Sequence, residues 1–150
     1  MHENAVMITL NGRDEALVFT TAALKRVQDK FGGIAELTEA FCGPQIEEWD
    51  TPEERETKRA QQAKAQGMAL DICIWLVALL ANQGRMLEDL KAELLTEQQV
   101  GLYMMPKDIE PLMQACMDAI AKGSGTYHEN DEVTDPLLEE ALKNAEGAGN

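Results

Sequence analysis

The sequence predicts an α+β fold that is mostly α: an N-terminal β-hairpin packed on a bundle of about five to six helices, followed by a flexible acidic C-terminal tail. Alternating apolar residues on both sides of Asn11-Gly12 indicate the hairpin. Apolar residues at helical spacing fill most of the chain up to residue 122. From there the composition is acidic and glycine-bearing, as in linkers. We therefore expect one domain over residues 1–122 and a tail over residues 123–150.

The register of the hairpin depends on the length of its loop. A two-residue loop at the Asn-Gly dipeptide, residues 11–12, would place Glu15 opposite Ile8 and put a carboxyl group on the apolar face. A four-residue loop, residues 11–14, instead pairs Ile8 with Leu17. We expect the longer loop, because burial of one face fixes the register more strongly than the turn dipeptide does.

The edges of the predicted hairpin lack the usual protection against pairing with another chain. Neither proline nor lysine lies between Val6 and Phe19, and no third strand is expected over residues 34–150. Because a lone hairpin is marginal in water, we expect it to pack one face on the helices and to pair along an edge with a neighbouring copy, which gives a homo-oligomer. Solvation of a short edge, or cover by a loop, is the alternative. The expected edge residues are Met7, Thr9 and Val18.

Caps, stops and apolar stripes divide the rest of the domain into helices. The expected helices run over about residues 21–31, 34–42, 52–81, 86–95, 97–104 and 106–122. Thr51, with Pro52 and Glu54 after it, forms a capping box at the start of the longest one. The apolar run from Met68 to Ala81 marks this helix as the centre of the domain, with Trp75 in the core.

The charge balance excludes several classes of partner. With 27 acidic and 13 basic residues, the chain has a net charge of −14. Nucleic acids and anionic membranes both attract cationic proteins, so neither partner is expected. The apolar run of the longest helix is too short to span a bilayer, and we expect a cytoplasmic protein. Much of the acidity gathers in a connector over residues 44–57 and in the tail.

Catalytic and metal-binding signatures are missing, so we expect neither an enzyme nor a cofactor. The two histidines, His2 and His128, lie in segments without the rigid partner that a catalytic histidine needs. No Cys-x-x-Cys or His-x-x-x-His spacing supports a metal site. Cys42, Cys73 and Cys116 lie in apolar helical patterns and are expected to be reduced core residues.

Some apolar residues are candidates for contact with a partner. An indole exposed in the acidic connector would mark a contact site. The Tyr-Met-Met group after the short helix suits either the core or a pliable partner surface. A Leu-Leu pair in the tail would lie on a short amphipathic helix over residues 136–145, which either frays or docks on a partner. The candidates are Trp49, Tyr103, Met104, Met105, Leu137 and Leu138.

Three segments occur in an order that resembles a known family. They are "ITLNGRDEALVFTTAALKRVQDKFGGIAEL", "DICIWLVALLAN" and "LTEQQVGLYMMPKDIEPLMQACMDAIAKG". In this order and spacing, over residues 5–123, the chain resembles the tail assembly chaperones of long-tailed bacteriophages and prophages. The resemblance implies a hairpin that leads into a helix ending at glycines, an apolar helix with a tryptophan, and a long final helix.

This resemblance also implies a function. The chain would bind the tape measure protein, a very long and largely helical partner, keep it soluble and help tail tube subunits to polymerise around it. The implied location is the cytoplasm of a bacterial host, with the chaperone absent from the mature virion. Long amphipathic helices need apolar cover, which a helical protein with grooves supplies. The alternative is an acidic inhibitor or DNA mimic that occupies a basic groove of a host protein, and its carboxylates would have to form a rigid array.

Overall fold

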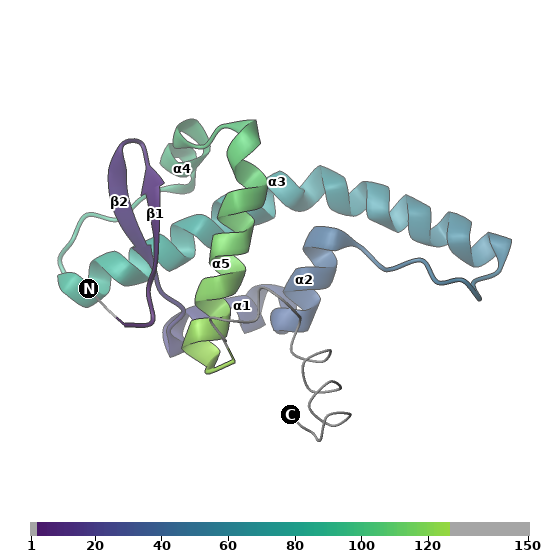
Figure 1. Ribbon diagram of the computed structural model, residues 1–150, viewed down its shortest axis with the longest axis horizontal. Helices are drawn as coiled ribbons and strands as arrows, with labels where there is room; N and C mark the ends of the chain where they lie inside the picture. The colour runs from purple at the N-terminus through teal and green to yellow at the C-terminus, as the bar shows by residue number, and fades with distance from the viewer. Residues whose placement is uncertain (1–2, 127–150) are drawn as a thin grey trace, which may run out of the picture.

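The computed structural model describes residues 3–126 and confirms a mostly helical α+β fold with an N-terminal hairpin. Figure 1 shows the hairpin beside α5, with α3 passing behind both. The expected tail helix over residues 136–145 lies outside the described residues. The elements are β1 (Val6–Leu10), β2 (Arg13–Leu17), α1 (Thr21–Phe31), α2 (Ile34–Cys42), α3 (Pro52–Glu88), α4 (Glu97–Tyr103), the 3-10 turn η1 (Pro106–Asp108) and α5 (Ile109–Ser124).

The hairpin has the shorter of the two loops. Asn11 at φ 55° and Gly12 at φ 75° form a two-residue turn, and Ile8 pairs with Glu15. Positive φ at both central residues gives a turn whose twist matches the strands, and Asn-Gly adopts it readily. The expectation of a four-residue loop was therefore wrong. Glu15 can lie on the inner face because its carboxylate forms an ion pair there with Arg85.

Helix α3 lies along the outer edge of β2. Just after the strand, the Val18 N–H donates to the Leu80 carbonyl oxygen over 3.2 Å. One helical turn further on, Gly84 comes so close to the Ala16 carbonyl oxygen that a Cβ on Gly84 would collide with it. One edge of the hairpin is thus covered by the protein's own central helix.

The core forms around the second half of α3. Trp75 is only 8% exposed and packs edge-to-face on Phe31, with ring centroids 5.6 Å apart, which confirms its place in the core. Met68 and Leu70 are 46% and 52% exposed, so the mainly buried stretch of α3 begins at Ile72 rather than at Met68. The expectation that this helix is too short to span a membrane was wrong by length and composition, because one stretch of α3 passes that test. However, 56% of the stretch is buried inside the domain, and core helices pass the same test.

The segment expected as a separate helix over residues 86–95 is mostly a loop. Helix α3 does not stop near residue 82 but continues to Glu88. Gly84 does not end the helix; it lies inside the helix, where α3 closely approaches β2. The Asn82 side chain then holds the loop by donating to the Leu95 carbonyl oxygen over 2.9 Å and accepting from the Leu95 N–H over 2.8 Å. The Leu95 backbone is therefore bonded outside any helix, and Leu90 is left 86% exposed.

The folded domain extends slightly beyond residue 122, its expected end, because α5 is longer than expected. The helix reaches Ser124, Gly125 ends it at φ 78°, and the Thr126 N–H donates to the Ala121 carbonyl oxygen over 2.8 Å. The boundary expected at residue 122 therefore falls inside the helix. The apolar stripe of α5 faces the core, as expected from its spacing.

The first half of α3 projects from the bundle together with the connector. Figure 1 shows this part of the helix extending beyond α2, with the connector running along it. We call residues 43–66 the acidic arm. Hydrogen bonds from α3 side chains to the connector, described below, hold its two parts together.

Candidate partner-binding surfaces

An ion pair fixes the connector of the acidic arm, residues 43–51, against α3. Lys58 Nζ lies 2.9 Å from Asp50 Oδ2 and also donates to the Gln45 carbonyl oxygen over 3.1 Å. The Glu47 N–H donates to the same Asp50 oxygen over 2.7 Å. The hydrogen bond from Lys58, and after it the bond from Glu47, lower the pKa of the Asp50 carboxyl, because both favour its charged form. The connector is therefore a defined loop.

Trp49 stands exposed on this fixed loop. Arg55 donates to the Glu48 carbonyl oxygen over 2.7 Å and to the Asp50 carbonyl oxygen over 3.2 Å, so the backbone on both sides of Trp49 is bonded to α3. The indole is nevertheless 78% exposed. A tryptophan on fixed backbone offers a large apolar area to a partner and loses little backbone freedom on binding. The structure places this candidate where a partner can reach it.

An apolar groove lies between α2 and α5, and we call it the α2–α5 groove. Its volume is about 300 Å³. Ile109, Met113 and Met117 repeat every four residues along one face of α5, and Glu110 is the one charged residue in the lining. The sequence analysis missed this groove, because the same spacing also predicts core residues. The lining residues are Thr38, Phe41, Cys42, Ile109, Glu110, Met113, Gln114 and Met117.

The three cysteines do not share one environment. Cys73 and Cys116 are buried, as expected, and burial raises the pKa of both thiols, that of Cys73 to about 11. Cys42 is exposed, so its assignment to the core was wrong. It is the last residue of α2, where the helix ends beside the groove. Cys42 is consequently the accessible thiol among the described residues.

The expected self-association edge is only partly available. Met7 is 44% exposed and Thr9 is also exposed. Because hydrogen-bonded pairs alternate along an antiparallel ladder and one flanks the two-residue turn, the backbone groups of Met7 and Thr9 point away from β2. Val18 is 2% exposed and its N–H is bonded to Leu80, so Val18 does not belong to this edge.

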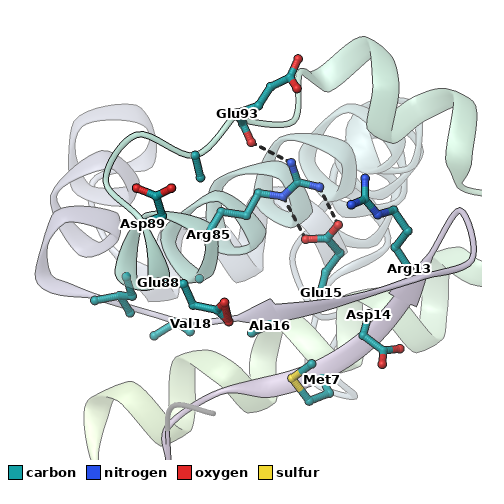
Figure 2. Close-up of a pocket in the computed structure, with 13 residues that line it drawn as sticks. Met7, Arg13, Asp14, Glu15, Ala16, Val18, Arg85, Glu88, Asp89 and Glu93 are labelled. Atoms are coloured by element: carbon teal, nitrogen blue, oxygen red, sulfur yellow. Dashed lines mark hydrogen bonds and ion pairs between the residues drawn. The ribbon is translucent and has the colours of Figure 1, made fainter.

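A wider groove of about 840 Å³ lies between β2 and the loop after α3, as Figure 2 shows. Arg85 Nε and Nη2 donate to the two carboxylate oxygens of Glu15 over 3.0 and 2.7 Å, and Nη1 donates to the Glu93 carbonyl oxygen over 2.7 Å. The hydrogen bond with Glu15 raises the pKa of Arg85. Sequence analysis missed this pair, whose partners are 70 residues apart. Arg85 thus links β2, α3 and the loop after α3, so we assign the ion pair a structural role.

The Tyr-Met-Met group divides between core and surface. Met104 is 9% exposed and belongs to the core, so it is not available to a partner in this structure. Tyr103 is partly buried against the core, whereas Met105 is 51% exposed. Leu102, which the sequence analysis did not single out, is 69% exposed on the same segment.

Some candidates fall outside the part of the chain that the structure describes. These are His2, His128, Leu137 and Leu138. Within residues 3–126, no group of three or more His, Cys, Asp or Glu side chains is placed to hold a metal ion.

Comparison of the chain with protein-family models, curated proteins and solved structures finds no match. A function is therefore inferred from the order of segments in the sequence and from the surfaces described above.

Proposed function

We propose that this chain is a tail assembly chaperone that binds the tape measure protein, keeps it soluble and helps to recruit tail tube subunits. The observation that carries the proposal is Trp49, 78% exposed on a loop that is bonded to α3 on both sides. A long, largely helical client has apolar helix faces that need cover before assembly. A rigid, exposed tryptophan is the type of anchor that contributes most to such contacts.

The charge next to Trp49 indicates which client helices would bind there. Two of its carboxylates are engaged within the arm: Asp50 pairs with Lys58, and Glu54 accepts the Thr51 N–H in the capping box. Glu48 is exposed beside the indole. We expect the client segment to present an apolar stripe flanked by lysine or arginine. The net charge of −14 also keeps many copies soluble when they crowd along one client.

The proposal includes self-association through the outer edge of β1. A chaperone that covers a long chain acts in many copies, and contacts between copies would coordinate them. The exposed residues Met7 and Thr9 mark the edge that remains once α3 has covered β2.

The acidic inhibitor has one observation in its favour, which is that the arm holds its carboxylates on a fixed loop. However, Asp50 and Glu54 are already used inside the arm, and an exposed Trp49 does not resemble a phosphate. Binding of a basic host protein that weakens steeply with salt would support this alternative.

The experiment is coexpression with a tape measure protein, the proposed client, followed by measurement of the soluble complex. Trp49→Ala should weaken binding by about 30-fold, the effect of losing a hot spot of about 2 kcal/mol. Leu90→Ala is the matched control, because Leu90 is 86% exposed on a loop outside the arm. In a Trp75→Phe background, Trp49 is the one remaining tryptophan, and its emission should shift to shorter wavelength when the client binds. Equal binding by both alanine variants, with no emission shift, would contradict the proposal.

A further inference from the structure

The α2–α5 groove is an open apolar surface beside the helix at which the described chain ends. Phe41, Ile109 and two methionines give it a largely apolar lining, and Glu110 is its charged residue. Helix α5 supplies Ile109, Met113 and Met117 from its first nine residues and then runs on to Ser124. Residues 127–150 follow directly after this helix.

The remaining chain is long enough to return to the groove. Met113 lies near the middle of the groove's α5 side and 13 residues before Thr126, which is about 20 Å along a helix axis. Residues 127–135 can span about 30 Å when extended. Their acidic composition favours extension. Residues 136–145 can therefore reach the groove and lie antiparallel to α5.

The sequence of this segment matches the groove in pattern, length and charge. Its apolar residues are spaced to fall on one face of a helix, and ten helical residues are about 15 Å long, close to the about 12 Å from Ile109 to Met117. In the antiparallel direction, Lys143, the one lysine or arginine of the tail, comes near Glu110. The apolar residues of the segment are Leu137, Leu138, Ala141 and Leu142.

We propose that residues 136–145 bind in the α2–α5 groove of the same molecule, with their leucines against the partly buried side chains of Phe41, Ile109 and Met117. This inference is independent of the proposed function, because it concerns only contacts within one chain. The bound segment adds few side chains to the core, so the domain folds without it, and a chain ending after Thr126 should unfold at nearly the temperature of the full chain.

Cys42 provides a native probe of this contact. Its thiol lines the groove and is exposed, whereas Cys73 and Cys116 are buried with raised pKa. At about pH 8, a maleimide should therefore modify Cys42 alone in the folded protein. If the segment occupies the groove in about 90% of molecules, labelling should be about tenfold slower than in molecules with an open groove. The Cys42→Ser variant verifies the site of labelling.

Three proteins are compared: the full chain, a Leu137→Asp/Leu138→Asp variant, and a Thr134→Asp/Asn144→Asp control. The control adds the same charge to the tail outside the apolar stripe. We expect slow labelling in the full chain and the control, and about tenfold faster labelling in the leucine variant and in a chain ending after Thr126. Far-ultraviolet circular dichroism should be unchanged over the folded domain.

Other results would overturn the proposal. Equal rates in all proteins would show that the segment does not occupy the groove. Slow labelling even in the shortened chain would show that the groove itself hinders the thiol. Protection that disappears on dilution would assign the contact to the tail of a second copy, which contradicts binding within one molecule.

Discussion

Gly67 and Gly84 lie in the same helix, α3, but alanine should have opposite effects at the two positions. A Cβ on Gly67 would meet no atom within 4 Å, so Gly67→Ala should stabilise the protein by about 0.5–1 kcal/mol through better helix propensity. A Cβ on Gly84 would collide with the Ala16 carbonyl oxygen and lie 3.2 Å from the Ala16 Cβ. Gly84→Ala must therefore move β2 away from the helix.

The magnitude follows from what the displaced strand loses. Overpacking of this kind costs about 1–3 kcal/mol. Separation of β2 from α3 also weakens the hydrogen bond from the Val18 N–H to the Leu80 carbonyl oxygen, a loss of about 1 kcal/mol. The better helix propensity of alanine offsets about 1 kcal/mol of this loss. The net expectation for Gly84→Ala is a loss of about 1–3 kcal/mol in the free energy of unfolding.

Urea unfolding followed by far-ultraviolet circular dichroism measures both variants. The unfolding midpoint should rise for Gly67→Ala and fall for Gly84→Ala, with the same dependence on denaturant in each. Both substitutions replace glycine by alanine inside one helix, so intrinsic propensity cancels in the comparison. A Gly84→Ala protein at least as stable as the wild type would show that β2 does not rest on α3, and would refute this account of the hairpin.

Two further predictions concern the arm and the strand edge. The pKa of Asp50 is lowered from 3.8, so its stabilisation of the arm is present above pH 3.8 and is lost as the pH falls through the folded value. In the Trp75→Phe background, Trp49 emission should change below about pH 4, and an Asp50→Asn variant should not show this change; equal pH profiles would contradict the assignment. Thr9→Pro removes an outward-pointing N–H of β1 and should convert an oligomer to monomer in sedimentation, whereas Thr9→Ala should not. A wild-type chain that stays monomeric at high concentration would exclude pairing through this edge.

Helix starts were predictable because caps are local signals. Thr51 accepts a hydrogen bond from the Glu54 N–H, as the capping box in the sequence predicted, and Thr20 and Thr96 cap α1 and α4 in the same way. Residues 82–95 were mispredicted, because asparagine and glycine there resemble a helix stop. In the structure, Asn82 binds the Leu95 backbone and Gly84 makes room for β2. Those contacts join distant parts of the chain, and no local pattern reports them.

The same distinction between local signals and contacts across the chain applies to the candidate surfaces. Exposure of Trp49 could be expected from its acidic neighbours, because few apolar residues surround it in the connector. The α2–α5 groove could not, since the residues that α5 contributes to it have the spacing of core residues, and Met113 is in fact buried in the core. Whether such a stripe is covered depends on how the helices pair. The same holds for Glu15, whose place on the inner face required a cation contributed by α3.

The single available edge limits the assembly that the hairpin can make. Within residues 3–126, α3 contacts the outer edge of β2 at Ala16 and, just after the strand, at Val18, so we expect β1 to be the strand that pairs with another copy. Pairing of β1 with β1 of a second copy is self-complementary and joins two hairpins into a four-stranded sheet, whose outer strands both rest on α3. Because α3 contacts the outer strand of each hairpin, we expect this contact to close at a dimer and not to extend into a ring or filament. Sedimentation should accordingly show a dimer as the largest species formed through the hairpin, and a larger assembly that persists in the Thr9→Pro variant would have to use another surface.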